Sequence, residues 1–193
     1  AEEVLEGVAQ SYRRGAPWAE AFARGIATLF AEEGLLLLDP RDPALAACAA
    51  ALPRKAPLDA DGIAAPLEAR AEAIAAAGFP VAVHVRQGAP LAFFHPEGPE
   101  GPRYRLQREG AGYREVGGSG QYGEAELLAA LEAEPLRFST SALLRPLLQD
   151  HLLPTAAYVG GPGEIAYLAQ LSPLYERFER RMPLIVGRSH FQV

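Results

Sequence analysis

The sequence contains few or none of several features, and each absence excludes one class of protein or function. It has one cysteine, Cys48, among 193 residues, which excludes an internal disulfide framework. This cysteine usage predicts that the protein is located in the reducing cytoplasm. No apolar run reaches the roughly 18 residues that a membrane-spanning helix needs. The 24 acidic residues outnumber the 18 basic ones, and the net charge of −6 argues against a nucleic-acid-binding surface.

Motifs of several enzyme classes are also missing. Neither G-x-G-x-x-G nor G-x-x-x-x-G-K-[ST] occurs in the glycine-rich stretch, so no dinucleotide or P-loop fingerprint applies. G-x-S-x-G is absent, and Ser189 and His190 are too close in sequence to act as nucleophile and base. His84 and His95 lack a third residue at metal-ligand spacing, so no metal is predicted and both are expected at exposed strand or loop positions. Cys48 lies in an apolar helix, where a small core residue is expected rather than a nucleophile.

The apolar residues, 49% of the chain, are sufficient for a sizeable core, and their spacing predicts an α/β fold. One helix begins at Pro17, carries an apolar stripe that includes Trp18 and Phe22, and ends with a left-handed cap at Gly34. Further helices are expected at residues 1–12, 43–52, 63–77 and 123–135, near 146, after 162 and from 172. Short apolar runs predict buried parallel strands at residues 35–38, 156–159 and 184–187. This pattern indicates a parallel-sheet core that the apolar stripe would cover.

Residues 80–120 have a different character. Alternating patterns predict strands at residues 81–85, 91–94, 104–107 and 113–116, separated by glycine- and proline-rich loops. We interpret them as a small antiparallel unit inserted into the core, which divides the chain into residues 1–79, 80–120 and 121–193. Residues 117–120 are expected to form a flexible joint, and residues 138–141 a cluster of helix N-caps.

A glycine turn at residues 158–167 is the centre of the predicted site. An apolar strand leads into Gly160 and Gly161, whose backbone freedom suits a tight turn, and Pro162 suits the first position of a helix. Such a turn leaves backbone N–H groups that can bind a carboxylate or phosphate. Glu164 would lie in the first helical turn, near the positive end of the helix dipole. The alternative is an ordinary strand-to-helix connection, and the spacing does not decide between the two.

Polar residues are expected to gather near this turn. The carboxyl ends of parallel strands meet at one edge of a sheet, which would bring Asp39 and Arg188 to the rim of the turn. Asp42 is interpreted as the cap of the next helix, and the role of Asp39 is left open. The polar residues of 145–150 either face solvent or bond to one another and to the turn, and we favour the second. The predicted binding residues are Arg145, Gln149, Asp150, Gly160, Gly161, Gly163, Glu164, Tyr167, Gln170 and Arg188.

A family resemblance extends this prediction. The second half of the chain contains FS at 138–139, LLRP at 143–146, QD at 149–150, LLPT at 152–155 and AYVGGPGEIAY at 157–167. The same half continues with AQL at 169–171, PLY at 173–175 and MP at 182–183, and GLLLLDPRDP occurs earlier, at 34–43. Together these segments resemble the bacillithiol biosynthesis cysteine-adding enzymes, from roughly Trp18 to the end of the chain.

The resemblance implies a Rossmann-like core with an inserted β-rich connecting domain. It implies a ligase that joins the cysteine carboxyl to the amine of glucosaminyl malate in the last step of bacillithiol synthesis. Activation by ATP, or binding of ADP, is plausible by kinship with cysteinyl ligases. In the family, a coiled coil that follows the region of Val193 joins two chains into a homodimer.

Two departures from the family pattern are visible. The family's glycine- and glutamine-rich segment after the first strand is missing, and the chain stops where the coiled coil would begin. The chain is therefore expected to be the central part of a larger enzyme and to be inactive alone. The alternatives are a non-catalytic α/β module that binds a nucleotide, amino acid or sugar, and a purely structural domain.

Overall fold

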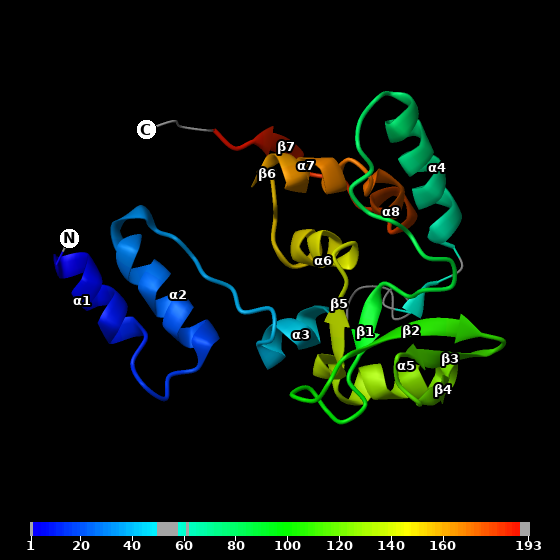
Figure 1. Ribbon diagram of the computed structural model, residues 1–193, viewed down its shortest axis with the longest axis horizontal. Helices are drawn as coiled ribbons and strands as arrows, with labels where there is room; N and C mark the ends of the chain where they lie inside the picture. The colour runs from blue at the N-terminus through cyan, green and yellow to red at the C-terminus, as the bar shows by residue number, and fades with distance from the viewer. Residues whose placement is uncertain (1, 50–57, 61, 190–193) are drawn as a thin grey trace. The chain divides into compact units, whose positions relative to one another are not determined.

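The computed structural model describes residues 2–49, 58–60 and 62–189 (Figure 1). The chain separates into two compact units, residues 1–40 and residues 41–193. Within the described parts, no helix is both long and apolar enough to cross a membrane.

The first unit is a pair of helices. It contains α1 (Glu2–Ser11), α2 (Trp18–Leu29) and the 3₁₀ turn η1 (Ala31–Glu33). Ala21 and Ser11 are buried, and the rings of Tyr12 and Trp18 are 5.1 Å apart. Gly34 ends the unit's helical part with a φ of 67°, which confirms the predicted left-handed cap.

The strand predicted at residues 35–38 is wrong. These residues have no strand conformation, and Leu36 is 92% exposed. A strand needs a neighbouring strand for its backbone hydrogen bonds, and the described part of residues 1–40 contains none. Within this unit the apolar stripe of α2 is largely exposed, with Trp18 at 77%, and the unit's described residues contain no sheet for it to cover.

The second unit contains a five-stranded antiparallel sheet in the order β4-β3-β2-β1-β5. Its strands are β1 (Ala92–Phe94), β2 (Tyr104–Glu109), β3 (Gly112–Val116), β4 (Gln121–Gly123) and β5 (Phe138–Thr140). Helix α5 (Glu124–Ala133) and the turn η3 (Pro135–Arg137) lie between β4 and β5. Phe94, Leu106 and Tyr113 pack against Leu127 of α5 in a common core. The predicted domain boundaries at residues 80 and 120 stay a prediction, and the sheet itself continues to residue 140.

Three segments in or near this sheet differ from the prediction. The segment expected as a flexible joint, residues 117–120, connects β3 to β4 within one sheet. Residues 138–140 form β5, which pairs with β1, and only Ser141 has a capping role, since its hydroxyl accepts the Leu144 N–H at 3.3 Å. Residues 81–85 form no strand, because the side chain of Gln170 bonds to the backbone groups of Ala82 and Val83 that a strand would share with a neighbour.

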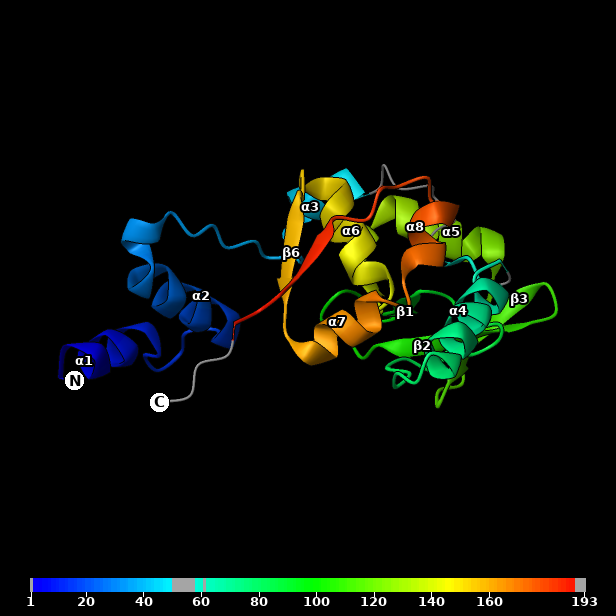
Figure 2. The same cartoon turned by 90° about the horizontal axis from the view of Figure 1, so that it is seen from above.

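The unit also contains the predicted parallel strand pair. β6 (Ala157–Gly160) and β7 (Leu184–Gly187) lie side by side, with Tyr158 opposite Ile185 and Gly160 opposite Gly187 (Figure 2). The surrounding helices are α3 (Pro43–Ala49), α4 (Ala64–Ala76), α6 (Leu144–Leu152), α7 (Pro162–Leu168) and α8 (Ser172–Arg177). Parallel and antiparallel strands together with these helices confirm the predicted α/β class with a β-rich part.

A second core joins α4, α6, α7 and α8. It is formed by Ile63 and Leu67 near the start of α4 and by apolar residues of α6, α7, α8 and the adjoining loops: Leu91, Leu144, Leu147, Leu168, Leu171, Leu174 and Tyr175. Pro146 is tolerated in α6 because it occupies the third helical position, where the backbone needs no intrahelical donor. The helix therefore begins two residues before the predicted start. Asp42 caps α3 as predicted, with its carboxylate accepting the Ala44 N–H at 2.7 Å.

Candidate functional site

The glycine turn connects β6 to α7 as predicted. Gly161 is the N-cap residue, with φ −72° and ψ 169°, a conformation that any residue can adopt. Glycine is required there by space, because a Cβ atom on Gly161 would lie 2.9 Å from Nη2 of Arg188. At Gly160 the corresponding atom would lie 3.3 Å from Glu164 and Tyr158. Backbone freedom was therefore the wrong reason for these glycines, and close approach of side chains is the correct one.

The carboxylate of Glu164 accepts hydrogen bonds from two residues of the strand and the turn. One oxygen of its carboxylate accepts the Gly161 N–H at 3.0 Å, and the other accepts the hydroxyl of Tyr158 at 2.8 Å. These two bonds, together with the charges of Arg188 and Arg145, hold the pKa of Glu164 below its usual value. The Gly161 N–H is thus already bonded, and the predicted role of this group as a free donor for an anion is not supported.

Arg145 stands beside the turn in the first turn of α6. Its guanidinium donates to the hydroxyl of Tyr167 in α7, and its Cζ lies 6.0 Å from the centre of that ring. Burial alone would lower the pKa of Arg145, but the bond to Tyr158 and the nearby Tyr167 and Glu164 outweigh it and raise the pKa. Arg145 is therefore a fixed positive charge at this site.

Tyr158 lies between these groups. Burial and the hydrogen bond to Glu164 raise the pKa of Tyr158 to about 12. Its phenol stays protonated at neutral pH and can only donate to the Glu164 carboxylate. Tyr158 was missing from the predicted set. The signal that could have found it is its place two residues before Gly160, since alternate strand residues point to the same face.

Arg188 follows directly after β7. Its backbone N–H donates to the Gly160 carbonyl at 2.8 Å, which extends the strand pairing by one residue. This bond places the guanidinium over Gly161, where its charge lowers the pKa of Glu164. The structure thus brings Arg145, Arg188 and Tyr167 to the glycine turn. Their role in binding a ligand stays a prediction.

Asp150, one of the predicted residues, bonds to a residue that the prediction missed. Its Oδ2 atom accepts the hydroxyl of Tyr175 in α8, while its Oδ1 atom is buried without a hydrogen-bond partner. Burial and the neighbouring carboxylate raise the pKa of Tyr175 well above its usual value. The charge of Arg145 also acts on Tyr175 and opposes this increase in its pKa, which places the pair near the turn.

The remaining predicted residues contribute less to this arrangement. Gln170 is 1% exposed, and its amide bonds to the backbone of Ala82 and Val83 at 2.8–3.0 Å. This placement indicates a brace for residues 81–85 rather than a ligand contact. Gly163 is exposed and faces open space, and Gln149 is half-buried in α6.

Two other expectations concern histidine and metals. His95 was expected at an exposed position, but it is only 5% exposed, because its ring bonds to Gly101 and Ser139. No group of three metal-ligating side chains occurs among the described residues. The site at the turn is therefore built from two guanidiniums, two phenols and one carboxylate, a combination that suits a carboxylate or phosphate ligand.

Comparison with known proteins gives one consistent result. Residues 1–189 match the family model described as "Bacillithiol biosynthesis BshC, N-terminal Rossmann-like domain". The chain is 42% identical over 185 residues to the "Putative cysteine ligase BshC" of Koribacter versatilis, covering 96% of this chain and 34% of that protein.

Further relatives carry the same name. The protein of Salinibacter ruber is 37% identical over 187 residues, covering 96% of this chain and 33% of the relative. The protein of Solibacter usitatus is 35% identical over 192 residues, covering 100% of this chain and 35% of the relative. The chain thus spans about a third of the length of these relatives.

Proposed function

The chain belongs to the BshC family, as its N-terminal Rossmann-like domain, and on this premise we propose that it is part of a cysteine ligase of bacillithiol biosynthesis. The enzyme would join the carboxyl group of cysteine to the amine of glucosaminyl malate, in the last step of the pathway. The new bond is an amide, so this carboxyl must be activated before the amine can attack it. Both substrates carry carboxylates, and each needs a cationic contact for orientation.

The observation that supports this proposal is the convergence of Arg145 and Arg188 on one glycine turn. A guanidinium can offer two parallel N–H groups to a carboxylate, which fixes the orientation of the group as well as its position. Glu164 compensates part of the positive charge and holds the turn in place through its bonds to Gly161 and Tyr158. We propose that the two arginines orient a substrate carboxylate and that Tyr158 and Glu164 position them.

A nucleotide fits this donor set through its phosphates. Arg145 and Arg188 are the groups that would hold ATP or ADP, because guanidiniums suit phosphate oxygens as well as carboxylates. The turn offers one backbone donor fewer than expected, since the Gly161 N–H is bonded to Glu164. Bound ATP would supply the activation of the cysteine carboxyl.

Three broader features follow from the same proposal. The complete protein is proposed to be a homodimer, joined by a coiled coil outside this chain. The single cysteine leaves no internal disulfide, in keeping with a place in the reducing cytoplasm. The partners are proposed to be small molecules, with no nucleic acid and no membrane.

The direct test is product formation by the protein made from its complete gene. The enzyme is supplied with cysteine, glucosaminyl malate and ATP, and the thiol product is labelled and measured by mass spectrometry. Arg145→Gln should lower kcat/KM by about ten- to hundredfold, the loss of one charge-assisted hydrogen bond. Arg86→Gln, which changes an exposed arginine outside this group, should leave the rate unchanged. Substrate binding without any product would favour the non-catalytic binding module instead.

A further inference from the structure

The outer face of the antiparallel sheet carries a second group of arginines, separate from the glycine turn. Neighbouring residues across an antiparallel pair lie on the same face, and alternate residues along a strand do so as well. Phe93 of β1 is opposite both Arg105 of β2 and Ser139 of β5. Because Phe94 points into the core with Leu106, these three residues point to the other side. Phe93 is half-buried there.

Two guanidiniums gather on the ring of Phe93. The Cζ atom of Arg103 lies 4.8 Å from the ring centre, and that of Arg105 lies 6.0 Å from it. A guanidinium stacked on an aromatic face keeps its N–H groups, which lie in its own plane, available for other acceptors. The Phe93 ring therefore positions the guanidiniums of Arg103 and Arg105 while their N–H groups remain available to a ligand.

The charge of these arginines is not compensated within the described residues. Other arginines of the same unit are engaged: Arg41 with Glu100, Arg108 with Glu124, Arg114 with Glu109 and Arg177 with Asp59. Among the described carboxylates, none pairs with Arg103 or Arg105, although the chain has a net charge of −6. The two Cζ atoms are at most about 11 Å apart, a distance at which salt at physiological concentration screens the charges only in part, since the Debye length is then about 8–10 Å. The two charges repel each other, and a bound anion would relieve this repulsion.

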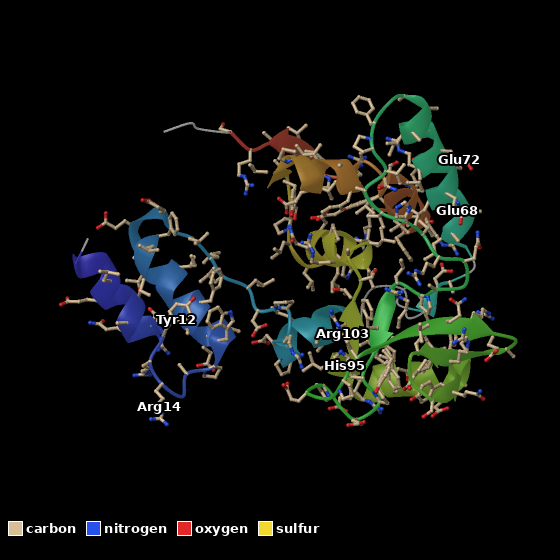
Figure 3. The ribbon with its side chains drawn as sticks, viewed as in Figure 1. Tyr12, Arg14, Glu68, Glu72, His95 and Arg103 are labelled. Atoms are coloured by element: carbon tan, nitrogen blue, oxygen red, sulfur yellow. The ribbon has the colours of Figure 1, made fainter. Side chains whose placement is uncertain are left out.

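The loop before Arg103 is firmly held, which fixes the position of this arginine. The Nδ1 atom of His95 is 3.1 Å from the Gly101 carbonyl, which can only accept, so Nδ1 carries the proton. The Nε2 atom lies 3.0 Å from the Ser139 hydroxyl on the neighbouring strand. Arg137 adds bonds of 3.1 Å and 2.7 Å to the carbonyls of His95 and Pro96. Figure 3 shows His95 and Arg103 near the same end of the sheet.

From this arrangement we propose that Phe93, Arg103 and Arg105 form a binding site for a small anion with phosphate or carboxylate groups. The two guanidiniums would bind its oxygens, and the Phe93 ring would keep them oriented. This site goes beyond the proposed ligase function, because it lies on the antiparallel sheet and its test needs no turnover. Phosphate and carboxylate ligands share this chemistry, so the experiment compares the two.

The test is a titration of the protein with inorganic pyrophosphate and, separately, with L-malate, followed by calorimetry and by NMR of the arginine side chains. Saturable binding of either anion should shift the Nε–H signals of Arg103 and Arg105, and the tighter ligand identifies the preferred group. Arg103→Gln and Arg105→Gln should each weaken this binding about tenfold or more. Arg105→Lys should lose part of the affinity, because lysine keeps the charge but not the fork of donors.

The matched control is Arg114→Gln, on the same face but paired with Glu109 at 3.9 Å. This variant should bind both anions as the unchanged protein does. Arg145→Gln should also leave the Arg103 and Arg105 signals and their shifts unchanged, which separates this site from the glycine turn. Absence of shifts at Arg103 and Arg105 with both anions would overturn the proposal. It would also be overturned if the Arg103→Gln and Arg105→Gln variants bound both anions as tightly as the unchanged protein does.

Discussion

Replacing Gly161 with alanine tests the predicted ligand role of Arg188 most directly. The backbone there is extended, at φ −72° and ψ 169°, so alanine introduces no conformational strain. The new methyl group would lie 2.9 Å from Nη2 of Arg188 and 3.9 Å from Oε2 of Glu164. The closer contact is with the far end of a flexible side chain, so the guanidinium should move away while the turn keeps its form.

The expected effects on folding and binding differ in size. The free energy of unfolding should change by less than about 1 kcal/mol, because no buried contact is lost. A displaced Arg188 loses a charge-assisted hydrogen bond of about 1.5–3 kcal/mol to a substrate carboxylate, which corresponds to about ten- to hundredfold in affinity. Urea unfolding gives the first quantity, and calorimetric titration with glucosaminyl malate gives the second.

Gly163→Ala is the matched control, because a Cβ atom at Gly163 meets nothing within 4 Å. This variant should bind as the unchanged protein does and gain up to about 1 kcal/mol of stability from the better helix former. Equal affinity of the Gly161→Ala and Gly163→Ala variants would show that Arg188 does not contact the ligand. A large loss of stability in Gly161→Ala alone would show that the turn cannot accommodate the movement of Arg188.

Four further outcomes are expected. Tyr158→Phe removes the bond to Glu164 and should lower the unfolding free energy by about 1.5–3 kcal/mol, measured in urea, whereas an unchanged value would contradict the network. Gln170→Ala leaves the backbone groups of residues 82–83 without partners and should lower the unfolding free energy by about 3 kcal/mol in the same assay. A change near zero would show that these bonds do not stabilise residues 81–85. Burial, and then the charge of Arg180, lower the pKa of His151, so its folded form resists protonation and stability should fall as the pH drops below 6.5. His151→Gln should make the unfolding free energy less dependent on pH in this range, and an unchanged dependence would show that other groups cause it. Residues 1–193 alone should yield no thiol product from cysteine, glucosaminyl malate and ATP, and turnover equal to that of the complete enzyme would place the whole site in this piece.

The parts of the fold that depend on local signals could be predicted from the sequence. The strand, glycine turn and helix at residues 157–168 are encoded by a short apolar run, two glycines, a proline at the first helical position and Glu164 at the third. The hairpin of β2 and β3 follows from alternating residues on both sides of a short turn. In both cases the elements that meet are neighbours in the chain.

The errors occur where distant segments decide the structure. Residues 35–38 and 81–85 have strand-like patterns, but a pattern does not reveal whether a partner strand is present. β5 was missed because its partner, β1, lies more than 40 residues earlier in the chain. The burial of His95 depends on Ser139, again from a remote strand. In the candidate site, Arg145 and Arg188 were predicted from their chemistry, and the structure places both at the turn. Tyr175 could not be predicted, because its partner Asp150 meets it only through the packing of α6 and α8. Tyr158 was missed although its partner Glu164 is only six residues away, because the prediction did not follow the alternation of side chains along β6.

The bond between Glu164 and the Gly161 N–H has a consequence for ligand selectivity. A tethered carboxylate is an intramolecular competitor, and its effective concentration at the donor is in the millimolar range or above. We expect an anion that contacts only this donor to compete poorly with the tethered carboxylate. Only a ligand that also engages Arg145 and Arg188 gains enough affinity to remain at the turn. On the proposed function, the turn would discriminate by the number of contacts a ligand makes, and Glu164 would compete with abundant small anions for the Gly161 N–H.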